Sequence, residues 1–470
     1  MTATRRRFLH RSLHAAMGGV GLFGGLGTLR LVEAATRATG GVPSDYKAMV
    51  CVFLFGGNDS FNMVVPFDNT HYDIYNATRP ALAIAQAALL QLTPQPGGLP
   101  SDGGSYGLHP AMPELRDLFH AQRASILANV GTLIGPITQS EYQNHSRPVP
   151  PQLFSHDDQS HFWQTSRPDD ISAAGWGGRI ADLLHAANPG QDLPMTLSLA
   201  GQSLLQRGDV IDQYVMNPCS SDGSGCGVAG IDYLDVYQNE LGAQSFHALM
   251  APATQAHLFE RAYAAATRRS IATYTTLQGM LQTLPTWAVP FPKSSLGGQL
   301  RQVANLINVR GPGALDMRRQ IFFVAQGGHD THDDQLGTQA ALLADLSASL
   351  HAFYQATVQM GIAADVTTFT ASDFGRSLST NGDGTDHGWG GHHFVIGGDV
   401  RGGRFFGQMP SLLQYGNPDD AGYGQIIPTT GVDQYAATLA RWFGVDATGL
   451  DTIFPSLGLY PTQDLGFFTP

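Results

Sequence analysis

The chain is 470 residues long, which is enough for a large buried core and is typical of about two to three domains. Hydrophobic residues make up 43% of it and charged residues 14%, so the composition is that of a globular protein rather than a disordered one. The formal net charge is −12. This acidic balance argues against a nucleic-acid partner, which requires a basic surface.

Residues 1–34 have the features of an export signal. The run Arg5-Arg6-Arg7 precedes a weakly apolar, glycine-rich stretch, and Val32-Glu33-Ala34 offers small residues for cleavage. The apolar stretch is short and interrupted for a membrane span, so we expect no stable span in the mature chain. We expect the twin-arginine translocase to export the chain in its folded form. A periplasmic or secreted location follows from that expectation.

The three cysteines fit an exported protein. Cys219 and Cys226 flank a loop of Ser, Gly and Asp, and in an oxidising compartment they would form a small disulfide clip. A metal site is the alternative, although no neighbouring cysteine pair would complete it. Cys51 lies inside an apolar run and is expected to be a buried small residue.

Apolar runs predict the buried strands of a mainly parallel sheet. In chain order these strands are expected at residues 48–55, 125–130, 195–199, 321–325, 366–370 and 394–397. Helices are expected at residues 109–121, from 155 onward, and at 176–187, 255–284, 296–309, 338–360 and 433–443. The helix at 338–360 would complete a βαβ unit. We expect a single α/β domain over residues 35–470, with a helical and loop insertion at about 200–312.

Polar residues follow several of these strands. Asp59 follows the first strand, Asp330 and His332 follow the strand at 321–325, and Asp373 follows the next one, with His387 in a loop shortly after. The carboxyl ends of parallel strands are the usual place for ligands in open α/β sheets. Carboxylates combined with imidazoles suit Zn²⁺, Mn²⁺ or Fe²⁺, whereas carboxylates alone suit Mg²⁺ or Ca²⁺. A metal there could polarise a phosphoryl or sulfuryl oxygen.

These residues also have purely structural explanations. Asp59 could stabilise a turn, and Asp330 with His332 could belong to a polar helix N-terminus. Asp373 could pair with Arg376, and Arg376 could instead clamp an anionic oxygen of a substrate.

The nucleophile is harder to place. Ser155 stands at a predicted helix N-terminus, where backbone N–H groups could hold an anion. It could equally be an N-cap, with Asp158 three residues later, and Ser60 is its rival as nucleophile. His156, Asp157 and Asp158 are either ligands or charges at a helix start.

Several motifs together carry a resemblance to a known family. They are "FLFGGNDSFNMVVP", "GLHPAMPELRDLF", "FSHDDQSHFWQT", "GWGGRIAD", "GGHDTHDDQ" and "SDFGRSLSTNGDGTDHGWGGHHFVIGG". With the export signal they resemble the DUF1501 family of exported bacterial proteins over nearly the whole chain. DUF1501 proteins look like distant members of the alkaline phosphatase and sulfatase superfamily. The resemblance implies a three-layer α/β sandwich around a mainly parallel sheet, a divalent metal (Zn, Mn, Fe, Ca or Mg), and a DUF1800-family protein as a partner.

The resemblance also implies roles for single residues. On its pattern the metal ligands would be Asp59, Asp330, His332, Asp373 and His387, and the nucleophile would be Ser155. The Asp-His pair usual in the superfamily reads Asp373-Phe374 here, so one imidazole is missing. A single metal, an altered metal or a lost activity would each fit that change.

Three functions are therefore weighed. The first is an exported metal-dependent hydrolase acting on a small anionic phosphate or sulfate ester. The alternative is a non-catalytic exported binding or partner protein that retains the fold. An exported redox enzyme is suggested by the export route alone, because no dinucleotide fingerprint or haem attachment motif supports it.

Overall fold

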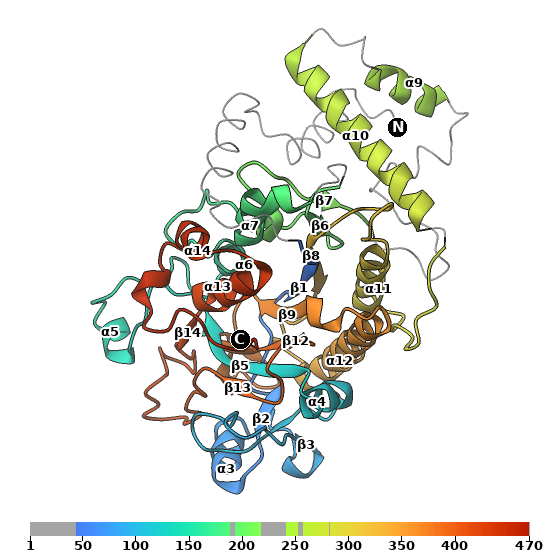
Figure 1. Cartoon of the computed structure of the whole chain (residues 1–470). Helices are drawn as coiled ribbons and strands as arrows, with labels where there is room; N and C mark the ends of the chain where they lie inside the picture. The colour runs from blue at the N-terminus through green and yellow to red at the C-terminus, as the bar shows by residue number, and fades with distance from the viewer. Residues whose placement is uncertain (1–43, 189–192, 218–240, 252–256, 282, 470) are drawn as a thin grey trace.

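The computed structural model of the chain describes residues 44–188, 193–217, 241–251, 257–281 and 283–469. The expected export segment and the loop with Cys219 and Cys226 lie outside these residues. A nine-stranded sheet forms the middle of the molecule (Figure 1). Its strands in order across the sheet are β13 (Phe405–Phe406), β5 (Ala124–Gly131), β12 (Gly391–Gly397), β9 (Val366–Ser372), β1 (Lys47–Leu54), β8 (Arg319–Gln326), β6 (Thr196–Ser198) and β7 (Tyr214–Val215), and β14 (Thr430–Gly431) also pairs with β5.

The sheet is mainly parallel. β1 lies between β8 and β9 and pairs with both in parallel register, and β6 continues the parallel order beyond β8. β12 runs antiparallel to β9 and β5 and so interrupts the order. The long strands β1, β5, β8, β9 and β12 are buried along almost their whole length, as expected of a sheet that is covered on both faces.

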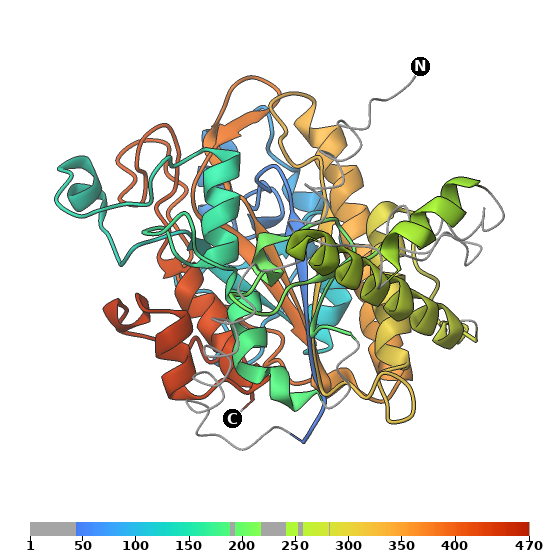
Figure 2. The ribbon, with the colours of Figure 1, turned by 90° about the horizontal axis from the view of Figure 1, so that it is seen from above.

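Helices cover both faces of the sheet. The helices among the described residues are α3 (Asn69–Thr78), α4 (Pro113–His120), α5 (Gln139–Gln143), α6 (His156–Thr165), α7 (Trp176–Leu184), α9 (Leu241–Met250), α10 (Leu258–Met280), α11 (Ser295–Asn308), α12 (Gln335–Gln359), α13 (Val432–Phe443) and α14 (Ala447–Ile453). Alternate residues of β1 face opposite layers. Val50 and Val52 pack in the core with α4, α11 and α12, whereas Met49, Cys51 and Phe53 pack with α6, α7 and α13. Figure 2 shows helices on both sides of the sheet. The expected three-layer α/β fold is confirmed.

Cys51 is a free, buried cysteine, as predicted. Burial raises the pKa of its thiol well above the ordinary value. The side chain is therefore a small core residue that stays protonated and is not nucleophilic.

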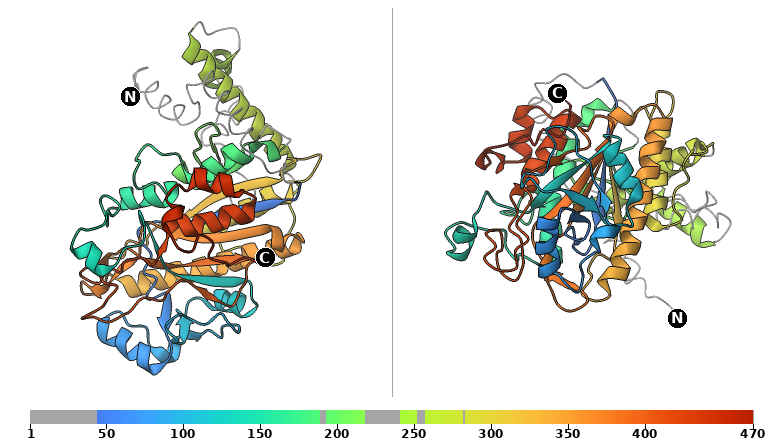
Figure 3. Two further views of the ribbon diagram at one scale, coloured as in Figure 1. Left: turned by 60° about the vertical axis from the view of Figure 1, so that its left-hand side comes forward. Right: turned by 90° about the horizontal axis from the view of Figure 1, so that it is seen from below.

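The segment expected as an insertion contains two kinds of structure. α9 and α10 project from one side of the molecule, away from the sheet (Figures 1 and 3). α11 instead packs against β8 and α12 and buries Leu300, Val303 and Ile307 in the core. Of the helices among the described residues, none combines the length and apolar character needed to cross a bilayer.

Two small sheets flank the main one. β2 (Val64–Pro66), β4 (Tyr106–Leu108) and β3 (Leu90–Gln91) form one of them beside α3. β10 (Arg376–Thr380) and β11 (Thr385–His387) form a hairpin directly after β9. This hairpin was not predicted, because its sequence is rich in Gly, Asp and Asn, yet it carries Arg376 and His387 back over the edge of the sheet.

Candidate metal centre

Three neighbouring parallel strands end at one edge of the sheet, and an aspartate follows each of them. Asp59 follows β1, Asp330 follows β8 and Asp373 follows β9. Glycines let these loops approach closely. Gly56 has a φ of +115°, and a Cβ there would lie 2.4 Å from the backbone nitrogen of Asp330. A larger residue at Gly56 would therefore displace Asp330.

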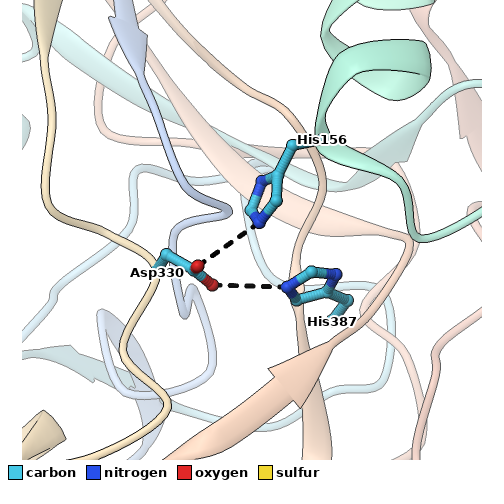
Figure 4. Close-up of side chains that lie close together, drawn as sticks. All are labelled: His156, Asp330 and His387. Carbon is cyan, nitrogen blue, oxygen red and sulfur yellow. Dashed lines mark ion pairs between the residues drawn. The ribbon is translucent and has the colours of Figure 1, made fainter.

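Three imidazoles converge on the carboxylate of Asp330, and Figure 4 shows two of them, His156 and His387. The Nε2 atom of His332 lies 3.0 Å from Oδ1, and that of His387 lies 3.3 Å from the same oxygen. The Nε2 atom of His156, on the first residue of α6, lies 3.4 Å from Oδ2. The residues come from three separate segments: the loop after β8, the end of β11 and the start of α6.

Two of the imidazoles, His156 and His387, are held from behind by hydrogen bonds at their Nδ1 atoms. Nδ1 of His156 lies 2.7 Å from Oδ2 of Asp373, and Nδ1 of His387 lies 2.6 Å from the carbonyl oxygen of Phe154. Nδ1 of His332 lies 3.3 Å from Oδ1 of Asp386. An Nδ1–H that donates to an acceptor leaves Nε2 as a lone-pair acceptor. The Nε2 lone pairs of His156 and His387 therefore face one carboxylate, that of Asp330.

The backbone of the loop before α6 is adapted to this arrangement. Phe154 has a φ of +71°, in the left-handed region that residues with a side chain rarely adopt. A residue held there costs about 1–3 kcal/mol. That conformation directs the Phe154 carbonyl to Nδ1 of His387 and begins the turn that leads into His156. The conformational free energy of Phe154 is therefore spent at the site itself.

Arg376 holds Asp330 in place. Its Nη1 atom lies 2.5 Å from Oδ1 of Asp330 and donates to the carbonyl of Gly56 at 3.2 Å. Its other donors bind the hydroxyl and the carbonyl of Thr385. Burial alone would raise the pKa of Asp330, but Arg376 outweighs it, so this pKa lies below the ordinary value. Because the guanidinium is fully buried, Arg376 is placed to orient Asp330 rather than to face solvent.

Asp373 lies behind the site, with its side chain only 3% exposed. Its Oδ2 atom accepts from His156 and from the backbone N–H of Gly56 at 3.1 Å. Burial raises the pKa of Asp373, although the bonds from His156 and Gly56 oppose that shift. Phe374, which stands where an imidazole was expected, packs its ring 4.9 Å from His156 and 4.7 Å from His387. His156, at the start of α6, thus supplies an imidazole to Asp373.

Asp59 is engaged elsewhere. Its carboxylate forms a bidentate pair with Arg79, at 2.5 and 3.1 Å, and both side chains are fully buried. It also accepts from the amide of Gln335. Gln335 accepts from the hydroxyl of Thr385, to which Arg376 donates. The structure therefore does not bring Asp59 among the imidazoles, and connects it to them through this chain of hydrogen bonds.

Ser155 occupies the N-cap position of α6, directly before His156. Its hydroxyl makes no capping bond to the helix backbone and instead donates to Oδ2 of Asp158 at 2.6 Å. The serine is half-buried. The structure thus places Ser155 next in sequence to a residue of the cluster, with a carboxylate in contact with its hydroxyl.

The donor set suits a divalent metal ion. His156, Asp330 and His387 each offer a ligand atom, and these atoms lie within 4.8 Å of one another. In a tetrahedral zinc site, ligand bonds of about 2.0–2.1 Å place the ligand atoms about 3.3–3.4 Å apart. The three Nε2 atoms lie 3.0–3.4 Å from the Asp330 oxygens, and those of His332 and His387 are 3.1 Å apart. Acceptors packed this closely require a cation or protons between them, so these residues fit a metal.

Residues 310–449 match a family described as a protein of unknown function, DUF1501. The matched residues include Asp330, His332, Asp373 and His387, so the predicted resemblance is confirmed over this part of the chain. No curated protein matches the chain.

The chain is also similar to several solved structures. One is Ps i-CgsB in complex with k-i-k-neocarrahexaose, at 10% identity and a TM-score of 0.35, covering 89% of this chain and 78% of that one. A second comes from work on the metabolism of multiple glycosaminoglycans by Bacteroides thetaiotaomicron, at 12% identity and a TM-score of 0.33, covering 91% and 77%. A third is the lipoteichoic acid synthase LtaP from Listeria monocytogenes, at 11% identity and a TM-score of 0.31, covering 93% and 80%.

The sequence left His156 undecided between a ligand and a helix-start charge. Its position at the start of a helix, after a buried strand and a loop, was the available signal. His392 and His393, two further histidines of the same region, are both buried in the core. Burial lowers their pKa values to about 4 and about 3, which fits neutral core residues outside the cluster.

Proposed function

We propose that the chain is a metal-dependent hydrolase of phosphate or sulfate esters. The ligands would be His156, Asp330, His332 and His387. The observation that carries this proposal is the convergence of three imidazole Nε2 atoms on one carboxylate, with His156 and His387 each held at Nδ1 by an acceptor behind it. Ligand histidines that are oriented in this way by carboxylates or carbonyls are typical of metal sites.

When bound, a divalent ion acts as a Lewis acid on a phosphoryl or sulfuryl oxygen. The residues of the chain prepare the site for it. Asp373 and the Phe154 carbonyl fix the tautomers of His156 and His387, and Arg376 orients Asp330. Burial lowers the pKa of His387, so this imidazole is neutral and able to bind a metal at neutral pH.

Ser155 is the proposed nucleophile. Its hydroxyl is in contact with Asp158 at 2.6 Å, and a carboxylate at that distance can accept the hydroxyl proton as the oxygen attacks. The start of α6 adds backbone N–H groups that favour a negatively charged ester oxygen. A Ser155→Ala variant that keeps full turnover would exclude this role without affecting the proposed ligands.

Metal analysis of the purified protein tests the centre. We expect bound metal in the wild type and lower occupancy in His156→Ala and in His387→Ala. His145→Ala is a matched control, because His145 is an exposed histidine outside the cluster. A wild-type protein that binds none of Zn, Mn, Fe, Ca or Mg, even when they are added, would refute the proposed centre.

Turnover is tested with 4-nitrophenyl phosphate and 4-nitrophenyl sulfate on the metal-loaded protein. The proposal expects hydrolysis of at least one ester, and expects its loss in His387→Ala. Normal metal binding with no hydrolysis of either ester would instead favour the non-catalytic binding protein that retains the fold.

A further inference from the structure

A cavity of about 370 Å³ lies between α3, the small sheet of β2 and β4, and the loop 409–419. Its lining includes the polar residues His71, Asp102 and Asp419 and the apolar residues Ile74, Leu412 and Leu413. Its size lies within the range of about 300–1,000 Å³ that is usual for small-molecule sites. α3 and the small sheet stand at the lower edge of the molecule in Figure 1, and none of the residues of the metal centre lines this cavity.

One wall carries fixed polar groups. His71, in the first turn of α3, has Nδ1 2.8 Å from Oδ1 of Asp68, and its Nε2 lies 3.8 Å from Oδ2 of Asp102. Asp102 accepts from the hydroxyl of Tyr106 at 2.6 Å and from the backbone N–H of Gly104 at 3.0 Å. These bonds hold the Asp102 carboxylate toward the cavity and leave it free capacity as an acceptor, because a carboxylate offers about four lone-pair sites.

The part of the lining that comes from the loop 409–419 is mostly apolar and is also fixed. Leu412 is held by a hydrogen bond from the Thr78 hydroxyl to its carbonyl at 2.8 Å. Asp419 accepts from the backbone N–H of Ser411 at 2.7 Å, which braces the loop. Leu413 is 42% exposed and offers apolar surface to the cavity from its edge. An apolar wall that faces a few fixed polar groups is typical of a small-molecule site.

We propose that this cavity binds a small organic cation, an amine carried on an apolar body. The charge of the lining decides the class of ligand. Among the described residues that line the cavity, Asp102 and Asp419 are acidic and none is Lys or Arg. The imidazole of His71 already lies against the carboxylates of Asp68 and Asp102. An ammonium group would donate to Asp102, while its apolar part would lie against Ile74 and Leu412. An anionic ligand would instead face two carboxylates, and a neutral apolar ligand would leave Asp102 without a new partner.

Calorimetric titration with 2-phenylethylamine tests the proposal, with 2-phenylethanol as the neutral counterpart. The full chain is titrated in the presence of EDTA, so that the metal centre does not contribute. We expect the amine to bind at least tenfold more tightly than the alcohol. Asp102→Asn should weaken amine binding at least tenfold and leave alcohol binding unchanged. It keeps an acceptor for Tyr106, so the fold is expected to persist.

Two further variants guard against indirect effects. Leu413→Trp should fill the edge of the cavity and weaken the binding of both compounds. Asp117→Asn, at a carboxylate that pairs with Arg116 away from the cavity, should change neither. The proposal is overturned if the amine fails to bind at millimolar concentrations, if amine and alcohol bind equally well, or if Asp102→Asn leaves amine affinity unchanged. Metal content, measured without EDTA, should be the same in every variant. The outcome of the amine titration is therefore independent of whether the proposed hydrolase activity exists.

Discussion

Replacing Asp373 by Asn should weaken metal binding while leaving the fold intact. The Asn side-chain oxygen can take the place of Oδ2, which accepts from His156 at 2.7 Å and from Gly56 at 3.1 Å. What the substitution removes is the negative charge behind the imidazole. Loss of such an outer partner lowers metal affinity by about 10–100-fold, or about 1.4–2.7 kcal/mol. Because Asp373 is only 3% exposed, solvent screens this charge little, and we expect a loss of about 30–100-fold.

The metal-free protein should respond in the opposite direction. Burial raises the pKa of Asp373, so folding makes the charged form of this carboxyl less favourable than it is in the unfolded chain. A carboxyl with a raised folded-state pKa stabilises the fold least once the pH has passed that pKa. At pH 7.5, therefore, Asp373→Asn should unfold at the same temperature as the wild type or at a higher one. Weaker metal binding in an equally stable protein is the signature of an outer partner.

Competition with a chromogenic chelator would measure the zinc affinity, and thermal unfolding in EDTA would measure the stability of the metal-free protein. Asp157→Asn is the matched control, because Asp157 is an exposed carboxylate next to His156 in the same turn of α6. If Asp373→Asn binds zinc within about threefold of the wild type, well below the 10–100-fold expected of an outer partner, then His156 is not a ligand oriented by Asp373.

Three other predictions concern stability and pH. Asp59→Asn should lower the free energy of unfolding by about 3–5 kcal/mol in urea titrations, because it breaks a buried ion pair with Arg79. Asp117→Asn, which affects an exposed ion pair, should have little effect. Reduced metal stoichiometry in Asp59→Asn would show instead that Asp59 is a ligand. Metal affinity should fall as the pH drops below about 6.5, since imidazoles bind metal in their neutral form. His387 should become protonated at a lower pH than an ordinary histidine, because its pKa is lowered. A metal affinity that stays constant between pH 7.5 and about 5 would contradict the proposal that imidazoles are ligands. Burial raises the pKa of Asp433 to about 7, so the contribution of this carboxyl to stability is lost as the pH rises from the ordinary carboxyl pKa to about 7. The melting temperature of Asp433→Asn should therefore fall less over this pH range than that of the wild type. An equal fall in both proteins would contradict this role of Asp433.

The sequence predicted the sheet well, because its strands are continuous apolar runs with glycines or polar residues at their ends. It also placed Asp330, His332, Asp373 and His387 in one region, since the carboxyl ends of neighbouring parallel strands must meet. It did not predict that Asp59 would bind Arg79, which follows α3, because a pairing between distant segments leaves no local pattern. His156 remained ambiguous for a related reason: a histidine at the start of a helix has the same local sequence whether it faces solvent or the site.

The position of β1 has a consequence for how the chain folds. This apolar strand is the first of the sheet in sequence, yet its two partners, β8 and β9, come from the second half of the chain. Contacts this distant close slowly, because a long loop must be ordered before the pairing stabilises anything. Until then both edges of β1 are unpaired, and such a strand is prone to aggregate. We therefore expect β1 of the newly made chain to be exposed to aggregation until β9 has been synthesised. Substitutions in β1 should affect refolding yield more strongly than the stability of the finished protein.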